Sequence, residues 1–179
     1  MNNDSSTMLD TLLETASNKW QVDENFVNEL IDKISFHESK GVVDAIQGND
    51  VTKPGRGLFQ YEKGYKQGAH TAINRLIGEI GYTPNFLQGI TSSDYDISKL
   101  SRDEQKILFL ADKLQNPSKG TNLGIAMGDD KDLSDEEIAD YWVDYHWSGY
   151  GDDMELREKM RNKFIEDLNW GYKQGKLTK

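Results

Sequence analysis

The sequence predicts a mainly helical α+β fold, and three observations support this prediction. Apolar residues recur every three or four positions in six or seven segments, which is the spacing of helices that bury one face. Between the second and third of these segments, residues 41–57 carry four glycines and one proline without any periodic run. Such a composition is typical of a small loop-rich or hairpin lobe. No series of alternating apolar and polar residues indicates a larger sheet.

Length and composition indicate one folded domain. The chain has 179 residues, enough for a single core, with 36% hydrophobic and 10% aromatic residues. We expect residues 1–21 to form an N-terminal tail with a short helix, and residues 22–179 to form the main domain. The sequence contains no internal repeat and no low-complexity linker.

Charge and cysteine content narrow the classes of partner and site. The formal net charge of −10 disfavours binding to nucleic acid or to an anionic membrane surface. The absence of cysteine excludes disulfides and thiolate metal sites. The polar, acidic start MNNDSSTMLD is unlike a secretory signal, and no stretch is long enough to span a bilayer. We therefore expect the chain in the cytoplasm of the producing cell or in a virion.

The first two helices follow from apolar spacing. After a ragged end over residues 1–8, a short amphipathic helix is indicated by Leu9, Leu12, Leu13, Ala16 and Trp20. We expect it to dock on the domain or, alternatively, on a virion or assembly partner. A second helix is predicted from about residue 23 to residue 36.

Three further segments complete the predicted helices. The period returns over residues 61–80, where small residues at 64, 68 and 72 suggest a buried central helix. Capping boxes at Ser101 with Glu104 and at Ser134 with Glu137 each introduce a helix, and the first of these helices should end near Asn116. The intervening residues 118–132 are loop-like. The last helix carries apolar residues at a strict spacing of four, Leu156, Met160, Phe164, Leu168 and Tyr172.

Glu38 is the first candidate for chemistry. The apolar stripe of the second helix, Val27, Leu30, Ile31 and Ile34, leads one turn later to this glutamate. Burying an unpaired carboxylate costs several kcal/mol, so such a group finds donors or keeps a proton near neutral pH. A neutral carboxylic acid beside a cleft is a proton donor. The alternative is a solvated residue, or one paired with Lys40 or Arg56.

Three fragments around this residue carry a family resemblance. They are ES at 38–39, DA at 44–45 and GLFQ at 57–60. Together they resemble the signature of the soluble lytic transglycosylases in the lysozyme-like superfamily, which are peptidoglycan-cleaving glycosidases. Two features depart from that signature. Phe59 replaces the usual methionine, and the loop between positions 45 and 57 is longer than in the common form.

The resemblance implies a lysozyme-like domain with a small hairpin lobe and roles for individual residues. It makes Glu38 the catalytic acid and base and Ser39 a residue that orients it. Gly57 and Gln60 become substrate contacts, with the Gln60 amide suited to N-acetyl groups. For Ser39 the alternative is a helix-end hydroxyl without function, and for Gln60 a surface residue at the start of the third helix.

An aromatic run, YWVDYHWSGY at 141–150, is the second candidate region. Aromatic faces stack on sugar rings, and Tyr145 and Trp147 are the candidates for this contact. In the resembled family a Tyr-Asn-Ala-Gly motif faces the acid, but here HWSG lies at the comparable place, with Trp147 in the position of asparagine. For Tyr141, Trp142 and Tyr145 the competing interpretation is core on an amphipathic helix, and we expect Trp142 to be core.

The reaction depends on whether a second carboxylate is present. A hydrolase needs one to hold water or to act as nucleophile, and Asp44 and Asp50 are the nearby candidates, although loop solvation is expected for both. A lone acid instead fits the family's transglycosylase route, in which the 6-hydroxyl of N-acetylmuramic acid attacks to give a 1,6-anhydro product. The expected partner is the peptidoglycan glycan strand, in the setting of a phage endolysin or virion-associated enzyme. A noncatalytic glycan-binding or adaptor module is the rival from another class.

No cofactor or metal is expected. HESKG lacks the second histidine of a zincin helix, and DDKDLSDEE lacks the glycine and closing glutamate of a calcium loop. GRGLFQ lacks the third glycine of a dinucleotide-binding loop. The histidines at 37, 70 and 146 are too scattered to indicate a site, although His37 is placed to tune Glu38.

Overall fold

The protein is described by a computed structural model over residues 3–46, 55–62, 68–88, 96–115, 133–147 and 149–179. Its helices are α1 (Asn3–Trp20), α2 (Glu24–Ser39), α3 (Gly68–Ile80), α4 (Arg102–Gln115), α6 (Asp135–Tyr141) and α7 (Met154–Lys173). Short turns of 3-10 helix are η1 (Asn85–Leu87) and η2 (Ile97–Lys99), and η3 (Trp142–Trp147) is a π-helix. The two strands are β1 (Gly55–Arg56) and β2 (Tyr61–Glu62). The predicted mainly helical class is confirmed.

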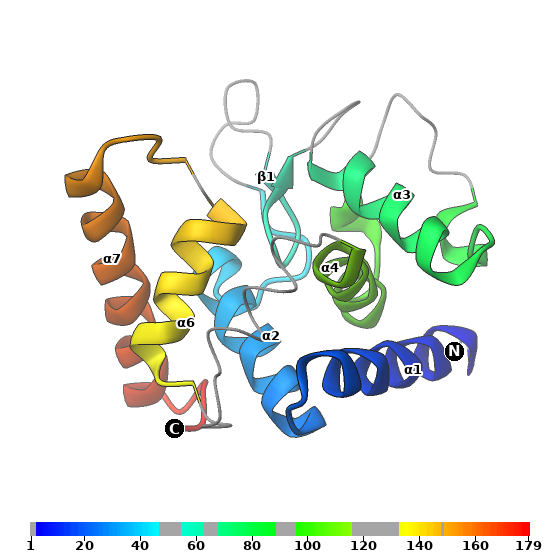
Figure 1. The fold of residues 1–179 in the computed structure, drawn as a ribbon, viewed down its shortest axis with the longest axis horizontal. Coiled ribbons are helices and arrows are strands. Elements are labelled where there is room, and N and C mark those ends of the chain that lie inside the picture. The colour runs from blue at the N-terminus through cyan, green and yellow to red at the C-terminus, as the bar shows by residue number, and fades with distance from the viewer. Residues whose placement is uncertain (1–2, 47–54, 63–67, 89–95, 116–132, 148) are drawn as a thin grey trace.

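The helices form two groups with α2 between them (Figure 1). In one group α4 packs against α1 and α3, and in the other α7 packs against α6 and α2. Buried apolar side chains from both groups belong to one hydrophobic core. No described helix has the length and apolar character needed to cross a membrane.

Helix α1 docks on the rest of the domain. Its apolar face, including Leu12, Ala16 and Trp20, is almost fully buried. The prediction of a ragged end over residues 1–8 is wrong from Asn3 onward, where the chain is already helical. The polar residues there carry no apolar period, so the sequence pattern missed them. Ser5 is nevertheless buried, and its hydroxyl donates to Glu104 at 3.4 Å.

The predicted third helix is shorter than expected. Tyr61 lies in strand β2, and α3 begins at Gly68, where φ is +36° and a Cβ atom would lie 2.6 Å from the backbone nitrogen of Glu62. Glycine is therefore required for this close approach. The residues between, including Gly64, lie outside the described part of the chain.

The most buried helix is α4 rather than α3. Every side chain of α4 from Ile107 to Leu114 is buried, whereas α3 has one buried face. A helical segment that is covered on all sides must be apolar nearly all round, which residues 107–114 of α4 are except at Asp112 and Lys113. The expectation that residues 61–80 form the central helix was therefore wrong.

Both predicted capping boxes are present. Ser101 accepts from the Glu104 backbone N–H at 3.3 Å, and the Glu104 carboxylate accepts from the Ser101 N–H at 2.8 Å. Ser134 and Glu137 form the same reciprocal pair. The first of these helices ends at Gln115, as predicted, and α7 buries Phe164 and Leu168. The loop predicted over 118–132 lies outside the described residues.

A small antiparallel hairpin forms the lobe expected after α2. Arg56 pairs with Tyr61, and Ile46 adds an isolated bridge to Arg56. The Gln105 side chain fixes the turn of the hairpin to α4. Its Oε1 accepts from the Leu58 N–H at 2.7 Å, and its Nε2 donates to the carbonyl of Val43 at 2.9 Å.

Candidate functional site

Glu38 lies in the last turn of α2, one residue before the helix ends. Asp23 caps the start of the helix through its carboxylate, and Lys40 ends it in the left-handed conformation with φ of 56°. The side chain of Glu38 is 14% exposed, as the apolar stripe predicts. The proposed alternative pairs do not form, because Lys40 contacts Asp167 at 2.5 Å and Arg56 lies 3.8 Å from Asp96.

Two ring nitrogens converge on one oxygen of Glu38. Trp142 Nε1 donates to Oε1 at 2.6 Å, and His146 Nε2 lies 3.4 Å from the same atom. An oxygen that accepts from N–H groups is a poor place for a proton. The acidic proton of Glu38 is therefore assigned to the other oxygen, Oε2.

The pKa of Glu38 is raised to about 7 from an ordinary value near 4.5. Burial is the largest cause, because a carboxylate loses its hydration there. The hydrogen bond from Trp142 and the charges of Lys113, Lys163 and Lys40 act in the opposite direction. Near neutral pH the group is therefore present in both protonation states, which suits a residue that donates and then accepts a proton.

The π-helix η3 supplies both rings. It continues directly from α6, and its wider turn carries Trp142 and His146, four positions apart, to the same carboxylate. Single π-turns inside helical segments occur frequently at functional sites. Trp142 is 1% exposed, so the expectation that it belongs to the core is confirmed, but its polar edge also belongs to the candidate site.

A buried ionic network lies behind His146. Lys113 Nζ lies 2.9 Å from His146 Nδ1 and 3.1 Å from the carboxylate of Asp112. Asp112 also accepts from Tyr61 Oη at 3.1 Å and from the Arg75 guanidinium. Asp112 is 4% exposed and Lys113 is 1% exposed. Mutual pairing offsets the several kcal/mol that burial of each charge would otherwise cost.

Sequence reasoning missed this network. One signal was available. Asp112 and Lys113 interrupt the run ILFLADKL, in which all the remaining residues are apolar. A charged pair inside a helical segment that is otherwise apolar all round must be buried and must find partners. The sequence did not predict which residues these partners are, because His146 is 33 positions away from Lys113.

His37 faces away from the acid, toward α7. Its Nδ1 lies 2.9 Å from the carboxylate of Asp167, and its ring contacts Phe164 and, in a T-shaped arrangement, Trp142. Burial lowers the pKa of His37 to about 4, although Asp167 opposes this shift. His37 is thus a neutral packing group between α2 and α7.

Three predicted contact residues make bonds within the fold. Ser39 Oγ donates to the Ser35 carbonyl at 2.9 Å, which is the helix-end bond of the alternative interpretation. Gly57 has φ of +72° and adjoins Gln105, whose Oε1 would lie 2.2 Å from an added Cβ. The Gln60 amide donates to the Gly57 carbonyl at 2.7 Å, and Gln60 closes the hairpin turn rather than opening a helix.

The two predicted aromatic contacts, Tyr145 and Trp147, are partly exposed, and Trp147 lies against the indole that bonds Glu38. Trp147 stacks on Trp142 with ring centres 5.9 Å apart and planes at 15°, and Tyr150 stacks on Trp147 at 6.4 Å. Tyr145 packs against Tyr141 at 5.7 Å. Both side chains pack against the core and remain partly exposed, and Trp147 has two ring neighbours, Trp142 and Tyr150.

Only one of the two candidates for a second carboxylate lies in the described part of the chain, and it does not join Glu38. Asp44 is exposed, in the loop after α2, and Asp50 lies outside the described residues. Within the described ranges, no group of three or more His, Asp or Glu side chains is arranged to hold a metal ion.

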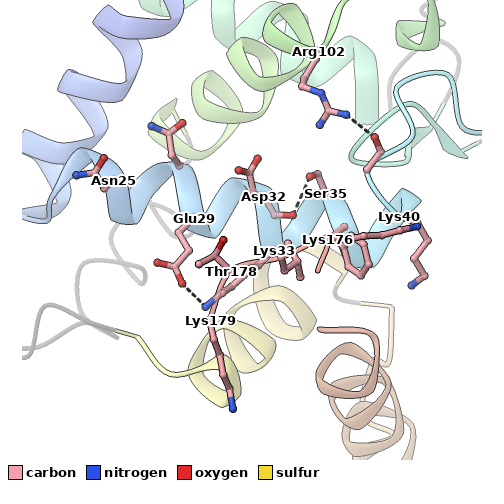
Figure 2. Close-up of a pocket in the computed structure, with 14 residues that line it drawn as sticks. Asn25, Glu29, Asp32, Lys33, Ser35, Lys40, Arg102, Lys176, Thr178 and Lys179 are labelled. Carbon is pink, nitrogen blue, oxygen red and sulfur yellow. Dashed lines mark hydrogen bonds and ion pairs between the residues drawn. The ribbon is translucent and has the colours of Figure 1, made fainter. Parts of the chain in front are cut away.

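A separate cavity of about 680 Å³ runs along another face of α2 (Figure 2). Asn25, Glu29 and Asp32 line it from the helix, and residues 176–179 line it from the C-terminal end. Arg102 reaches across from α4 to donate to the Gly41 carbonyl at 2.7 Å. Glu38 is not among its lining residues, because it lies on the stripe that the helix turns toward the core.

Comparison with protein-family models, curated proteins and solved structures finds no match to this chain.

Proposed function

We propose that this chain is a peptidoglycan lytic transglycosylase of the lysozyme-like superfamily. It cleaves the β-1,4 bond between N-acetylmuramic acid and N-acetylglucosamine, with Glu38 as general acid and then general base. One observation carries the proposal: the carboxyl group of Glu38, 14% exposed at the end of a helix and without a second carboxylate beside it among the described residues, has a pKa raised to about 7. The hairpin packed beside that helix end and the resemblance of residues 38–60 support it further.

In the first step, Oε2 of Glu38 gives its proton to the glycosidic oxygen, and the bond from that oxygen to the muramic acid C1 breaks. The burial that raises the pKa of Glu38 makes the neutral acid available at pH 7. The resulting carboxylate is stabilised at Oε1 by the indole N–H of Trp142.

In the second step, the carboxylate takes the proton of the muramic acid 6-hydroxyl as that oxygen attacks C1. The product is a 1,6-anhydro sugar, and Glu38 returns to its protonated state without water entering the reaction. This route needs a single carboxyl group. A hydrolytic muramidase would use a second one, but Asp44 is exposed and no described carboxylate contacts Glu38.

Substrate contact is proposed for the aromatic surface of η3. Trp147 and Tyr145 are partly exposed and would stack on sugar rings beside the acid. Gln60 is a weaker contact, since its amide nitrogen is already bonded to backbone carbonyls. The proposed setting is a phage endolysin or virion-associated enzyme that acts on the bacterial cell wall.

A zymogram on purified cell walls tests the proposal. The wild-type protein should clear the gel, and Glu38→Gln should clear nothing while keeping the wild-type circular dichroism spectrum. Glu14→Gln removes the same charge from an exposed position of α1 and should clear normally. A folded wild-type protein that clears no wall type would instead favour the noncatalytic adaptor.

A further inference from the structure

The contact between Lys113 and His146 fixes the hydrogen positions on the imidazole. A lysine ammonium is only a donor, so Nδ1 of His146, 2.9 Å away, must be the acceptor. The ring proton then lies on Nε2, and an imidazolium with protons on both nitrogens would oppose the lysine. The hydrogen-bond network thus selects the neutral Nε2–H tautomer.

The Nε2–H group has two acceptors within reach. The carbonyl oxygen of Phe59 lies 3.3 Å from Nε2, and Oε1 of Glu38 lies 3.4 Å from it. The Phe59 carbonyl keeps a constant charge, whereas Oε1 becomes a much stronger acceptor when Glu38 loses its proton. The N–H is therefore placed to strengthen its contact with Glu38 at the moment the carboxylate forms.

We propose that His146 is the positioning residue of Glu38, held by Lys113 as the Nε2–H tautomer so that it restrains Oε1 while Oε2 exchanges the proton. His146 itself transfers no proton. Asp112 holds Lys113 in place, and is in turn held by Arg75 and Tyr61. This inference rests on the proposed function, which assigns the reaction, and it adds the residues that orient the acid.

A first test needs no substrate. In protein labelled with ¹⁵N-histidine, long-range ¹H–¹⁵N spectra report which nitrogen carries the proton, and the His146 signals are those lost in His146→Gln. At pH 7 we expect a protonated Nε2 and an unprotonated Nδ1 for His146. A protonated Nδ1 would overturn the inference whether or not the protein cleaves peptidoglycan.

Two substitutions separate positioning from packing. In His146→Gln, the amide nitrogen occupies the place of Nε2 and keeps a donor toward Glu38. In His146→Asn, the amide lies at the place of Nδ1 and leaves Glu38 without this donor. We expect kcat to fall about 100-fold in the asparagine variant, with KM little changed, and about tenfold or less in the glutamine variant. Equal losses in the two variants would contradict the inference.

A double-mutant cycle tests the role of Lys113. Lys113→Met should lower kcat when His146 is present, because the ring is then free to adopt the other tautomer. In the His146→Gln background, where no tautomer needs selecting, it should add little. Additive losses would show that Lys113 does not act through His146. If Lys113→Met fails to fold, the wild-type tautomer measurement still decides.

The titration of Glu38, followed by ¹³C spectra of its carboxyl group, separates loss of the donor from loss of packing. Loss of packing would hydrate the carboxylate and lower the midpoint, because burial is the largest cause of the raised pKa. The groups that face it are Lys113 from α4, Lys163 from α7, Lys40 after α2, and the two rings of η3. His146→Asn should raise the midpoint, since a donor to the charged form is lost, and His146→Gln should not. An unchanged midpoint in the asparagine variant overturns the inference, while a wild-type protein that cleaves no wall overturns only the proposed function.

Discussion

Trp142 Nε1 donates a 2.6 Å hydrogen bond to Oε1 of Glu38, joining the π-helix η3 to the last turn of α2 across 104 positions of sequence. The bond and the burial of Glu38 shift the pKa of its carboxyl group in opposite directions. Burial holds the proton on Glu38, and the indole N–H favours its release. Their balance keeps the pKa of the carboxyl group at about 7.

Activity should decline above neutral pH. If Glu38 must enter the reaction protonated, kcat/KM is full below a pH of about 7 and falls as the pH rises through that value. In Trp142→Phe the indole bond that lowers the pKa of Glu38 is lost, so the falling limb should move to higher pH. A pH series of initial rates on purified walls measures both profiles.

Trp147→Phe is the matched control for this change. Trp147 stacks on Trp142 but makes no bond to Glu38. Its substitution should therefore weaken activity at all pH values without moving the pH at which activity falls. An activity that increases through pH 7 in the wild type would be incompatible with the role of Glu38 as an acid.

The raised pKa of Glu38 also predicts how stability depends on pH. Between a pH of about 4.5 and about 7, the folded state holds a proton that the unfolded state has released. The free energy of unfolding therefore falls over this window and levels off above it. Glu38→Gln does not lose stability in this way. The free energy of unfolding of the variant minus that of the wild type should therefore increase by on the order of 3 kcal/mol from pH 4.5 to pH 7. Urea unfolding at several pH values measures the difference, which should stay constant in Glu14→Gln.

His37 should act with the opposite sign. Its pKa is lowered to about 4 from 6.5, so in that window the unfolded state holds the proton. Stability from His37 is thus present above pH 6.5 and is lost as the pH falls toward 4. In Glu38→Gln the opposing contribution of Glu38 is absent, so we expect the free energy of unfolding to rise with pH between about 4 and 6.5. Adding His37→Gln should remove this rise. A slope that survives in the double variant would assign it to other groups.

Gln105 should be a structural residue of the site. Its amide bonds the Leu58 N–H and the carbonyls of Val43 and Leu100, all from a fully buried position. Gln105→Met keeps the shape but leaves these backbone groups unpaired, so we expect a loss of roughly 2 to 4 kcal/mol in unfolding free energy. Gln115→Met, at an exposed position of the same helix, should change it by less than about 0.5 kcal/mol. Equal effects in the two variants would contradict this role.

The sequence predicted those parts of the structure that depend on local pattern. The apolar stripe of α2 led to a Glu38 side chain that is only 14% exposed, and the two capping boxes located the starts of α4 and α6. These features involve residues within a few turns of each other, where helical spacing determines which side chains share a face.

The parts that depend on long-range pairing were missed or misplaced. Tyr61 continued a helical period in sequence, but it pairs with Arg56 in the hairpin, because tertiary contacts override a weak local preference. His146 read as one of three scattered histidines until the fold brought it to Lys113 and Glu38. The π-helix η3, which turns His146 toward Glu38, was not predicted from the sequence.

Mass spectrometry of the sugars released from purified peptidoglycan is the most direct test of the central claim, that Glu38 alone serves as acid and then base. The account predicts 1,6-anhydro-muramic acid ends from the wild-type protein and no released product from Glu38→Gln. Products with ordinary reducing ends would show that water attacks instead, and would contradict the transglycosylase route.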